Sequence, residues 1–264
     1  MTKPALMGPD LIASIVSRRV PENALALWWL GQASFAIRGA GLTIYIDPFL
    51  NPMPDRLVPP PFAPEDVTNA DVVLCSHDHG DHVDPEALPG IAAASAGARF
   101  VIPGTAKSRV LALGIAPERT VVPAVDQPVS FGALTVTAVP AAHEDLAYSP
   151  ETGYHYLGFV LKLNGVTLYH SGDSKVYRGM AERVKAYQPD VALLPINDND
   201  NMSYRQAGDL AAALDVDLVI PMHYGMFAYN TEWVGNFVDY VQERYPAQKQ
   251  HPMARNEGFL YTKY

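Results

Sequence analysis

The segment with the clearest capacity for chemistry is Ser76–His82, which reads Ser-His-Asp-His-Gly-Asp-His and holds three of the chain's eight histidines. Neutral imidazole and carboxylate groups are the usual protein ligands of Zn²⁺, Mn²⁺ and Fe²⁺. Packing gains nothing from three imidazoles, because each one needs hydrogen-bond partners once it is buried. The alternative is a solvated polar loop. The density of ligand-type residues favours a metal site.

The spacing of these residues indicates a loop and not a helix. His77 and His79 are two positions apart, so they cannot lie on one helical face. Gly80 between the ligands allows a sharp turn of the backbone. The apolar run over 71–75 just before them is typical of a short buried strand. We therefore expect the cluster at the end of a strand.

The rest of the chain predicts two packed sheets with helices outside. Short β-rich runs broken by glycines indicate consecutive strands, and Asn164-Gly165 indicates a hairpin turn. No linker suggests a boundary, so we expect one domain over 1–264. The predicted strands are 25–30, 33–38, 42–46, 71–75, 99–102, 120–122, 129–131, 134–139, 156–163, 166–169, 190–195, 217–221 and 258–262. The predicted helices are 85–96, 105–113, 176–187, 203–214 and 231–244, after an amphipathic lead-in over 1–24 with Leu11, Ile12, Ile15 and Val16 at helical spacing.

The composition of the chain limits the classes of molecule that it is expected to bind. The net charge is −9 and the 19 Lys and Arg residues are scattered, which argues against nucleic acid as a partner. The single cysteine, Cys75, excludes an intramolecular disulfide and suits a reducing compartment. No apolar run approaches the ~20 residues of a membrane span, and no leader pattern opens the chain. We expect a cytoplasmic protein that acts on a small molecule and does not bind a membrane; a homo-oligomer is compatible with its aromatic-rich strands.

Ser76–His82 resembles the H-x-H-x-D-H signature of the metallo-β-lactamase superfamily. The family's other ligand motifs follow in the expected order along essentially the whole chain. They are Tyr-Ile-Asp-Pro at Asp47, Pro-Ala-Ala-His at His143, His-Ser-Gly-Asp-Ser at Asp173 and Ile-Pro-Met-His-Tyr at His223. The resemblance implies an α/β (α+β) fold, the four-layer αββα sandwich of that superfamily.

The resemblance also implies a ligand set for two divalent ions, Zn²⁺ or Mn²⁺, with Fe²⁺ also compatible. A hydroxide bridging the ions would attack an acyl carbon or a phosphorus. Asp47 would accept the free N–H of a ligand imidazole, although it is also an ordinary strand-end residue before Pro48. Asp81 is in addition a candidate proton acceptor. The implied ligands are His77, His79 and His143 for one ion, Asp81, His82 and His223 for the other, and Asp173 bridging both.

Short sequence segments resemble one branch of the superfamily, the L-ascorbate-6-phosphate lactonase or UlaG-like group. This chain is shorter than those lactonases. The segments are Trp28–Phe35, Leu194–Asn197 and Pro221–Tyr224. They imply a lactone-opening hydrolase with candidate substrate contacts at Asn197, Arg205 and Tyr224. His170, three residues before Asp173, is either catalytic or a satisfied core histidine.

Three alternatives stay open on the sequence. The same fold supports a phosphodiesterase acting on a small phosphodiester or a phospholipid headgroup. It also supports di-iron redox chemistry, although the flavin-bearing relatives need a further domain for which this chain has no room. A non-catalytic metal-binding protein with a decayed site fits less well, because the implied ligand set is intact.

Overall fold

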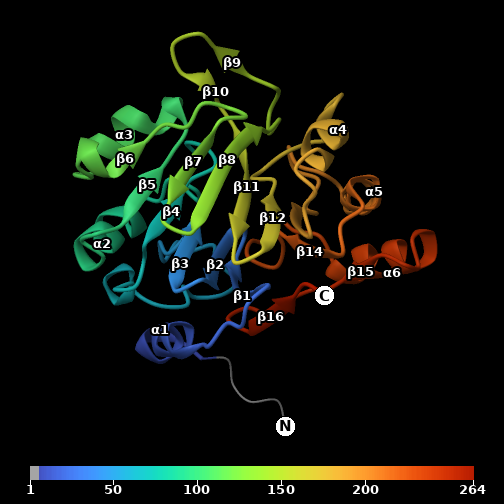
Figure 1. Ribbon diagram of the computed structural model, residues 1–264, viewed down its shortest axis with the longest axis horizontal. Coiled ribbons are helices and arrows are strands. Elements are labelled where there is room, and N and C mark those ends of the chain that lie inside the picture. Colours follow the sequence, from blue (N-terminus) through green and yellow to red (C-terminus); the bar gives the residue numbers. More distant parts are fainter. Residues whose placement is uncertain (1–5) are drawn as a thin grey trace.

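A computed structural model describes residues 6–264, and its core is a pair of seven-stranded sheets. The first sheet has the order β16 (Gly258–Thr262), β1 (Ala24–Gly31), β2 (Ser34–Gly39), β3 (Leu42–Ile46), β4 (Val72–Leu74), β5 (Arg99–Val101) and β6 (Thr120–Val121). The second has the order β15 (Lys249–Gln250), β14 (Leu218–Met222), β13 (Val191–Pro195), β12 (Val166–His170), β11 (Leu157–Leu163), β8 (Leu134–Pro140) and β7 (Pro128–Phe131). A small hairpin of β9 (Tyr148–Ser149) and β10 (Gly153–Tyr154) projects beyond the second sheet (Figure 1).

Helices cover the outer face of each sheet. On the first sheet lie α1 (Gly8–Ser17), α2 (Ala87–Ala94) and α3 (Lys107–Ala112), and on the second lie α4 (Met180–Lys185), α5 (Tyr204–Leu214) and α6 (Val234–Arg244) (Figure 1). Short 3-10 helices occur at η1 (Pro64–Asp66), η2 (Gly104–Ala106) and η3 (Pro117–Arg119). The order helix, sheet, sheet, helix is the predicted αββα sandwich.

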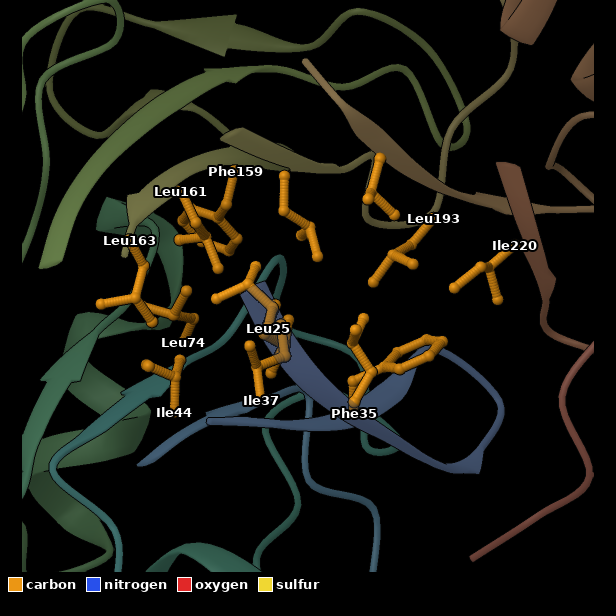
Figure 2. Close-up of a cluster of buried hydrophobic side chains, with 14 of the residues drawn as sticks. Leu25, Phe35, Ile37, Ile44, Leu74, Phe159, Leu161, Leu163, Leu193 and Ile220 are labelled. Atoms are coloured by element: carbon orange, nitrogen blue, oxygen red, sulfur yellow. The ribbon is translucent and has the colours of Figure 1, made fainter. Parts of the chain in front are cut away.

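The alternation of side chains along the strands produces these layers. In β2, Phe35 and Ile37 enter the core between the sheets while Ala36 packs toward α1 and α2. In β11, Leu161 enters the same central core while Val160 packs toward the helices of the second sheet. Successive side chains of a strand point to opposite faces, so strands buried on both faces are apolar at almost every position. Figure 2 shows the side chains of the two sheets meeting in the central core.

Strand direction gathers several loops at one edge of the sandwich. β3 and β4 are parallel, as are β12, β13 and β14. β8 runs in the same direction as β12, because both pair antiparallel with β11. The carboxyl ends of these strands therefore open toward loops that can share a site. The opposite edge carries tight turns, including Asn164-Gly165, whose Asn164 side chain donates to the carbonyls of Pro21 and Ala24, both at 2.8 Å.

Some predicted boundaries were wrong. The helix predicted over 176–187 spans only Met180–Lys185, because Gly179 before it has a left-handed backbone with φ +86°. The lead-in predicted over 1–24 forms a helix from Gly8, where Leu11, Ile12 and Ile15 are buried but Val16 is 44% exposed. Residues 1–5 lie outside the described residues. None of the helices over 6–264 has the length and hydrophobicity needed to cross a bilayer.

Candidate metal centre

The loops at the carboxyl edge bring seven predicted ligand side chains together in three overlapping groups. In each group the potential ligand atoms lie within 4.8 Å of one another. The seven side chains come from both sheets, because the Ser76–His82 loop follows β4 while the loops after β8, β12 and β14 supply the other three. The groups are His77, His79 and His143; His77, His82 and Asp173; and Asp81, His82 and His223.

Asp173 lies at the centre of this cluster. Its Oδ2 atom is 3.0 Å from His223 Nε2, 3.5 Å from His82 Nε2 and 4.0 Å from His143 Nε2. Asp81 Oδ2 lies 3.6 Å from His82 Nε2 and 4.0 Å from His223 Nε2. One carboxylate therefore reaches imidazoles of both triads, which is the position required of a bridging ligand.

The cluster contains buried polar atoms that a cation would satisfy. His77 Nε2, His82 Nε2 and Asp173 Oδ1 have no hydrogen-bond partner among the described residues. Leaving such atoms buried and unpaired costs about 1–3 kcal/mol each. A divalent cation accepts lone pairs from imidazole and carboxylate at once, so the donor set fits a metal ion.

Electrostatics keep two of the ligands, His77 and Asp173, in a metal-binding form, while they favour the protonated form of His82. Burial, reinforced by His82, lowers the pKa of His77 well below its usual value, so His77 stays neutral. Burial alone would raise the pKa of Asp173, but the neighbouring His223 and His82 outweigh it and hold that pKa well below its usual value. Burial opposes protonation of His82 as well, yet Asp47 and the other carboxylates raise its pKa. Asp173 therefore faces the imidazoles of His82 and His223 as a carboxylate.

Asp47 fixes the Ser76–His82 loop through hydrogen bonds to its first and last residues. Its Oδ2 is 2.8 Å from His82 Nδ1 and accepts from Ser76 Oγ at 2.7 Å, while its Oδ1 accepts from the Ser76 backbone N–H at 2.7 Å. An N–H donated by Nδ1 to this carboxylate leaves the Nε2 lone pair free for a cation. His143 shows the same pattern, because its Nδ1 donates to the Asp200 carbonyl at 2.9 Å.

The sequence matches the family model described as the beta-lactamase superfamily domain over residues 26–223, a segment that holds all seven clustered side chains. This chain belongs to the metallo-β-lactamase superfamily. Within that superfamily it is similar to curated UPF0173 metal-dependent hydrolases. It is 35% identical to the one from Thermococcus kodakarensis, over 74% of this chain and 83% of the relative. It is 33% identical to the one from Myxococcus xanthus, over 84% of this chain and 80% of the relative.

Solved structures agree on the fold. The metallo hydrolase Igni18 from Ignicoccus hospitalis superposes with a TM-score of 0.74, covering 91% of this chain and 100% of that chain at 23% identity. This superfamily member is therefore a metal-dependent hydrolase by family, with the expected metallo-β-lactamase fold.

His170, predicted as either catalytic or structural, lies in a position that favours the structural role. It is fully buried, its Nε2 donates to the Ala33 carbonyl at 2.8 Å, and its Nδ1 accepts from the Gly172 N–H at 3.0 Å. Both ring nitrogens are thus engaged by backbone groups, which leaves neither available for substrate.

The predicted substrate contacts Asn197, Tyr224 and Arg205 each have other side chains as neighbours. Asn197 Nδ2 donates to Asn230 Oδ1 at 2.6 Å, and Asn230 lines a cavity beside the metal ligands. Tyr224 packs its ring on Trp29, with centroids 4.5 Å apart. Arg205 lies over the Tyr204 ring in the first turn of α5. None of the three predicted contacts, Asn197, Tyr224 and Arg205, belongs to the lining of the cavity.

The cavity has a volume of about 350 Å³ and touches the metal cluster through Asp81. The sequence assigned none of its other members to a substrate cavity, although Gly80 lies in the ligand motif and Gln32 in the Trp28–Phe35 segment. Its lining combines aromatic, amide and basic residues: Gln32, Phe49, Asn51, Met53, Gly80, Pro85, Arg109, Phe227, Tyr229 and Asn230. Tyr156 was also missed, and its ring lies 5.5 Å from the rings of both His77 and His143.

Proposed function

We propose that this metal-dependent hydrolase uses two divalent ions to open a lactone or a related cyclic ester. The observation that carries the proposal is the position of Asp173, whose carboxylate lies between His223 and His82 on one side and His143 on the other. A carboxylate shared by two imidazole groups is the arrangement that a two-ion site requires.

In this proposal the clustered residues have separate roles in binding metal, orienting the ligands and accepting a proton. His77, His79 and His143 would hold one ion, and Asp81, His82 and His223 the other. Divalent ions held by these residues would lower the pKa of water and polarise an acyl oxygen. The chain itself orients these ligands through Asp47 and supplies Asp81, which both reaches His82 and lines the cavity. Asp81 is thereby placed to accept a proton from the reacting groups.

The cavity supports a small substrate without a phosphate group. Its volume suits a compact molecule. Its lining includes one basic residue, Arg109, whose Nη1 donates to the Asp78 carbonyl at 2.6 Å and lies 3.1 Å from Asp78 Oδ1. Lys175, an alternative anion contact, pairs with Asp200 at 2.6 Å. Both charges are therefore compensated, which favours an uncharged lactone.

The test combines metal counting with a substrate panel. Protein purified without chelator is analysed for bound metal and assayed on plain lactones, phosphorylated lactones and bis-p-nitrophenyl phosphate. We expect about two ions per chain and lactone opening that falls at least 100-fold in His79→Ala. His251→Ala is the matched control, because that imidazole stacks on Phe259 at 4.1 Å and lies outside the cluster.

Each other result has a definite meaning. Cleavage of the phosphodiester alone would move the assignment to a phosphodiesterase of this fold. Fewer than one ion per chain after reconstitution, with no activity on the panel, would overturn the two-ion proposal.

A further inference from the structure

Gln32 occupies a strained backbone position at the turn between β1 and β2. Its φ is +47°, in the left-handed region where glycine or asparagine is less strained. Two hydrogen bonds hold it there, because its carbonyl accepts from Trp29 Nε1 at 2.8 Å and from the His223 N–H at 2.9 Å. Strain maintained by surrounding bonds is characteristic of functional positions.

The Gln32 side chain is buried with an incompletely satisfied amide. The residue has no exposed surface, and Oε1 has no hydrogen-bond partner among the described residues. Its Nε2 lies 3.4 Å from His223 Nε2, the atom that also faces Asp173. An imidazole nitrogen has one lone pair, so it cannot bind a cation and accept from the amide together. Once a cation is bound, the amide N–H is free.

Gln32 borders the cavity beside the metal ligands, although its surface is buried in the unliganded protein. Gln32 and Asp81 belong to its lining together with the aromatic rings of Phe49 and Phe227, whose centroids lie 6.1 Å apart. A ligand in this cavity therefore lies beside Gln32, a metal-ligand candidate and two aromatic residues that are themselves largely buried. Polar groups of this kind fix the orientation of a ligand in an otherwise apolar site.

We propose that Gln32 binds the substrate directly, donating its amide N–H to the acyl oxygen of the scissile ester while an apolar substituent packs against Phe49 and Phe227. The inference rests on the proposed hydrolase function. As the ester carbonyl becomes tetrahedral, its oxygen gains negative charge, and a hydrogen bond to it strengthens. The site would accordingly prefer lactones with an aromatic or alkyl substituent over unsubstituted ones.

The test replaces Gln32 by Met, which keeps the length of the side chain and removes the amide. Gln32→Gly is a second variant, because glycine suits the left-handed backbone and protects the test from a folding failure. Gln250→Met is the matched control: Gln250 also has an unpaired buried Oε1, but it lies on β15, outside the cavity. Bound metal, thermal midpoint, kcat/KM on a substituted lactone and the Kd of phenylphosphonate are measured for each protein loaded with Zn²⁺.

We expect both Gln32 variants to retain metal and thermal stability while kcat/KM falls about 10- to 100-fold, the range for loss of one hydrogen bond to a developing charge. Phenylphosphonate, which places a tetrahedral anion beside a ring, should bind at least about fivefold more weakly. Gln250→Met should match the wild type. The wild type could hydrolyse no lactone and still bind phenylphosphonate more tightly than the Gln32 variants do. That result would support the role of Gln32 and overturn the lactonase proposal.

Two results would overturn the role of Gln32. The first is a kcat/KM and a phenylphosphonate affinity that are unchanged in the Gln32 variants. Failure of the wild type to bind phenylphosphonate at all counts as the same result. The second is loss of bound metal in the Gln32 variants, because the amide would then act through His223 and not on the substrate.

Discussion

At the scale of single residues, the site depends on carboxylates that fix the imidazoles. Asp47 is fully buried and accepts from Ser76 twice while facing His82 Nδ1. Its backbone has a left-handed φ of +45°, as has His223 at +63°. Such positions cost of order 1–3 kcal/mol, so the surrounding bonds must hold them in place.

We predict that Asp47→Asn lowers zinc affinity about 10- to 100-fold without unfolding the protein. An amide cannot accept at both of its heavy atoms, so either His82 or Ser76 loses its acceptor. Competition with a chromophoric chelator measures the affinity. Asp71→Asn is the control, because Asp71 also accepts from a backbone N–H, that of Thr43 at 2.7 Å, but lies outside the cluster. Equal affinities for both variants would refute the orienting role.

The sequence revealed the clustered side chains more completely than the substrate contacts. His77, His79 and His82 are recognisable because several ligand-type residues stand close together in an ordered motif. Gln32 lies in the Trp28–Phe35 segment, which indicated a branch of the superfamily but no role for this side chain, and Arg109 stands in no motif. They reach the cavity only through the turn of a hairpin and one face of a short helix, both of which depend on tertiary packing.

At the scale of elements, the loop after β12 sets the position of Asp173. Gly172 has φ +60°, and a Cβ built on it would collide with the carbonyl oxygen of Leu157 and come within 2.9 Å of Ser76 Cβ. The loop therefore packs directly against the ligand loop of the other sheet, and no side chain fits between them.

We predict that Gly172→Ala destabilises the fold by about 1–3 kcal/mol more than Gly132→Ala, because the backbone strain is common to both and overpacking occurs only at Gly172. Gly132 is the matched control, since it has the same φ of +60° but open space around its Cβ position. Urea unfolding of both metal-free variants measures the difference. Equal losses of unfolding free energy would show that only the backbone angle matters at Gly172.

The predicted bounds of helices and strands were accurate where the hydrophobic pattern of the element was clear. They were inaccurate where the backbone conformation of a single residue set the end of the element. The strand predicted over 42–46 and the helix predicted over 203–214 are observed at Leu42–Ile46 and Tyr204–Leu214. The helix over 176–187 was too long because the left-handed conformation of Gly179 is invisible to periodicity. The two-residue strands β9, β10 and β15 are too short to show any period.

At the scale of the whole molecule, the metal centre joins the two sheets at one edge. The Ser76–His82 loop extends from the first sheet, and the loops carrying His143, Asp173 and His223 extend from the second. At the opposite edge the sheets are linked by the Asn164 side chain, which holds the carbonyls of Pro21 and Ala24. A metal ion bound by these residues would therefore cross-link the two sheets at the carboxyl edge.

We predict that chelation loosens this edge selectively. Ligand binding stabilises the folded state by about 4 kcal/mol at a free metal concentration 1,000 times Kd, so the midpoint of thermal unfolding should fall on metal removal. Amide hydrogen exchange should accelerate over 76–83, 141–144 and 171–174, whose loops meet at the cluster, and stay unchanged over 162–166. His79→Ala should show the fast pattern even with added zinc. Uniform acceleration across both edges would mean that the metal stabilises the fold globally, and no change at either edge would remove its structural role.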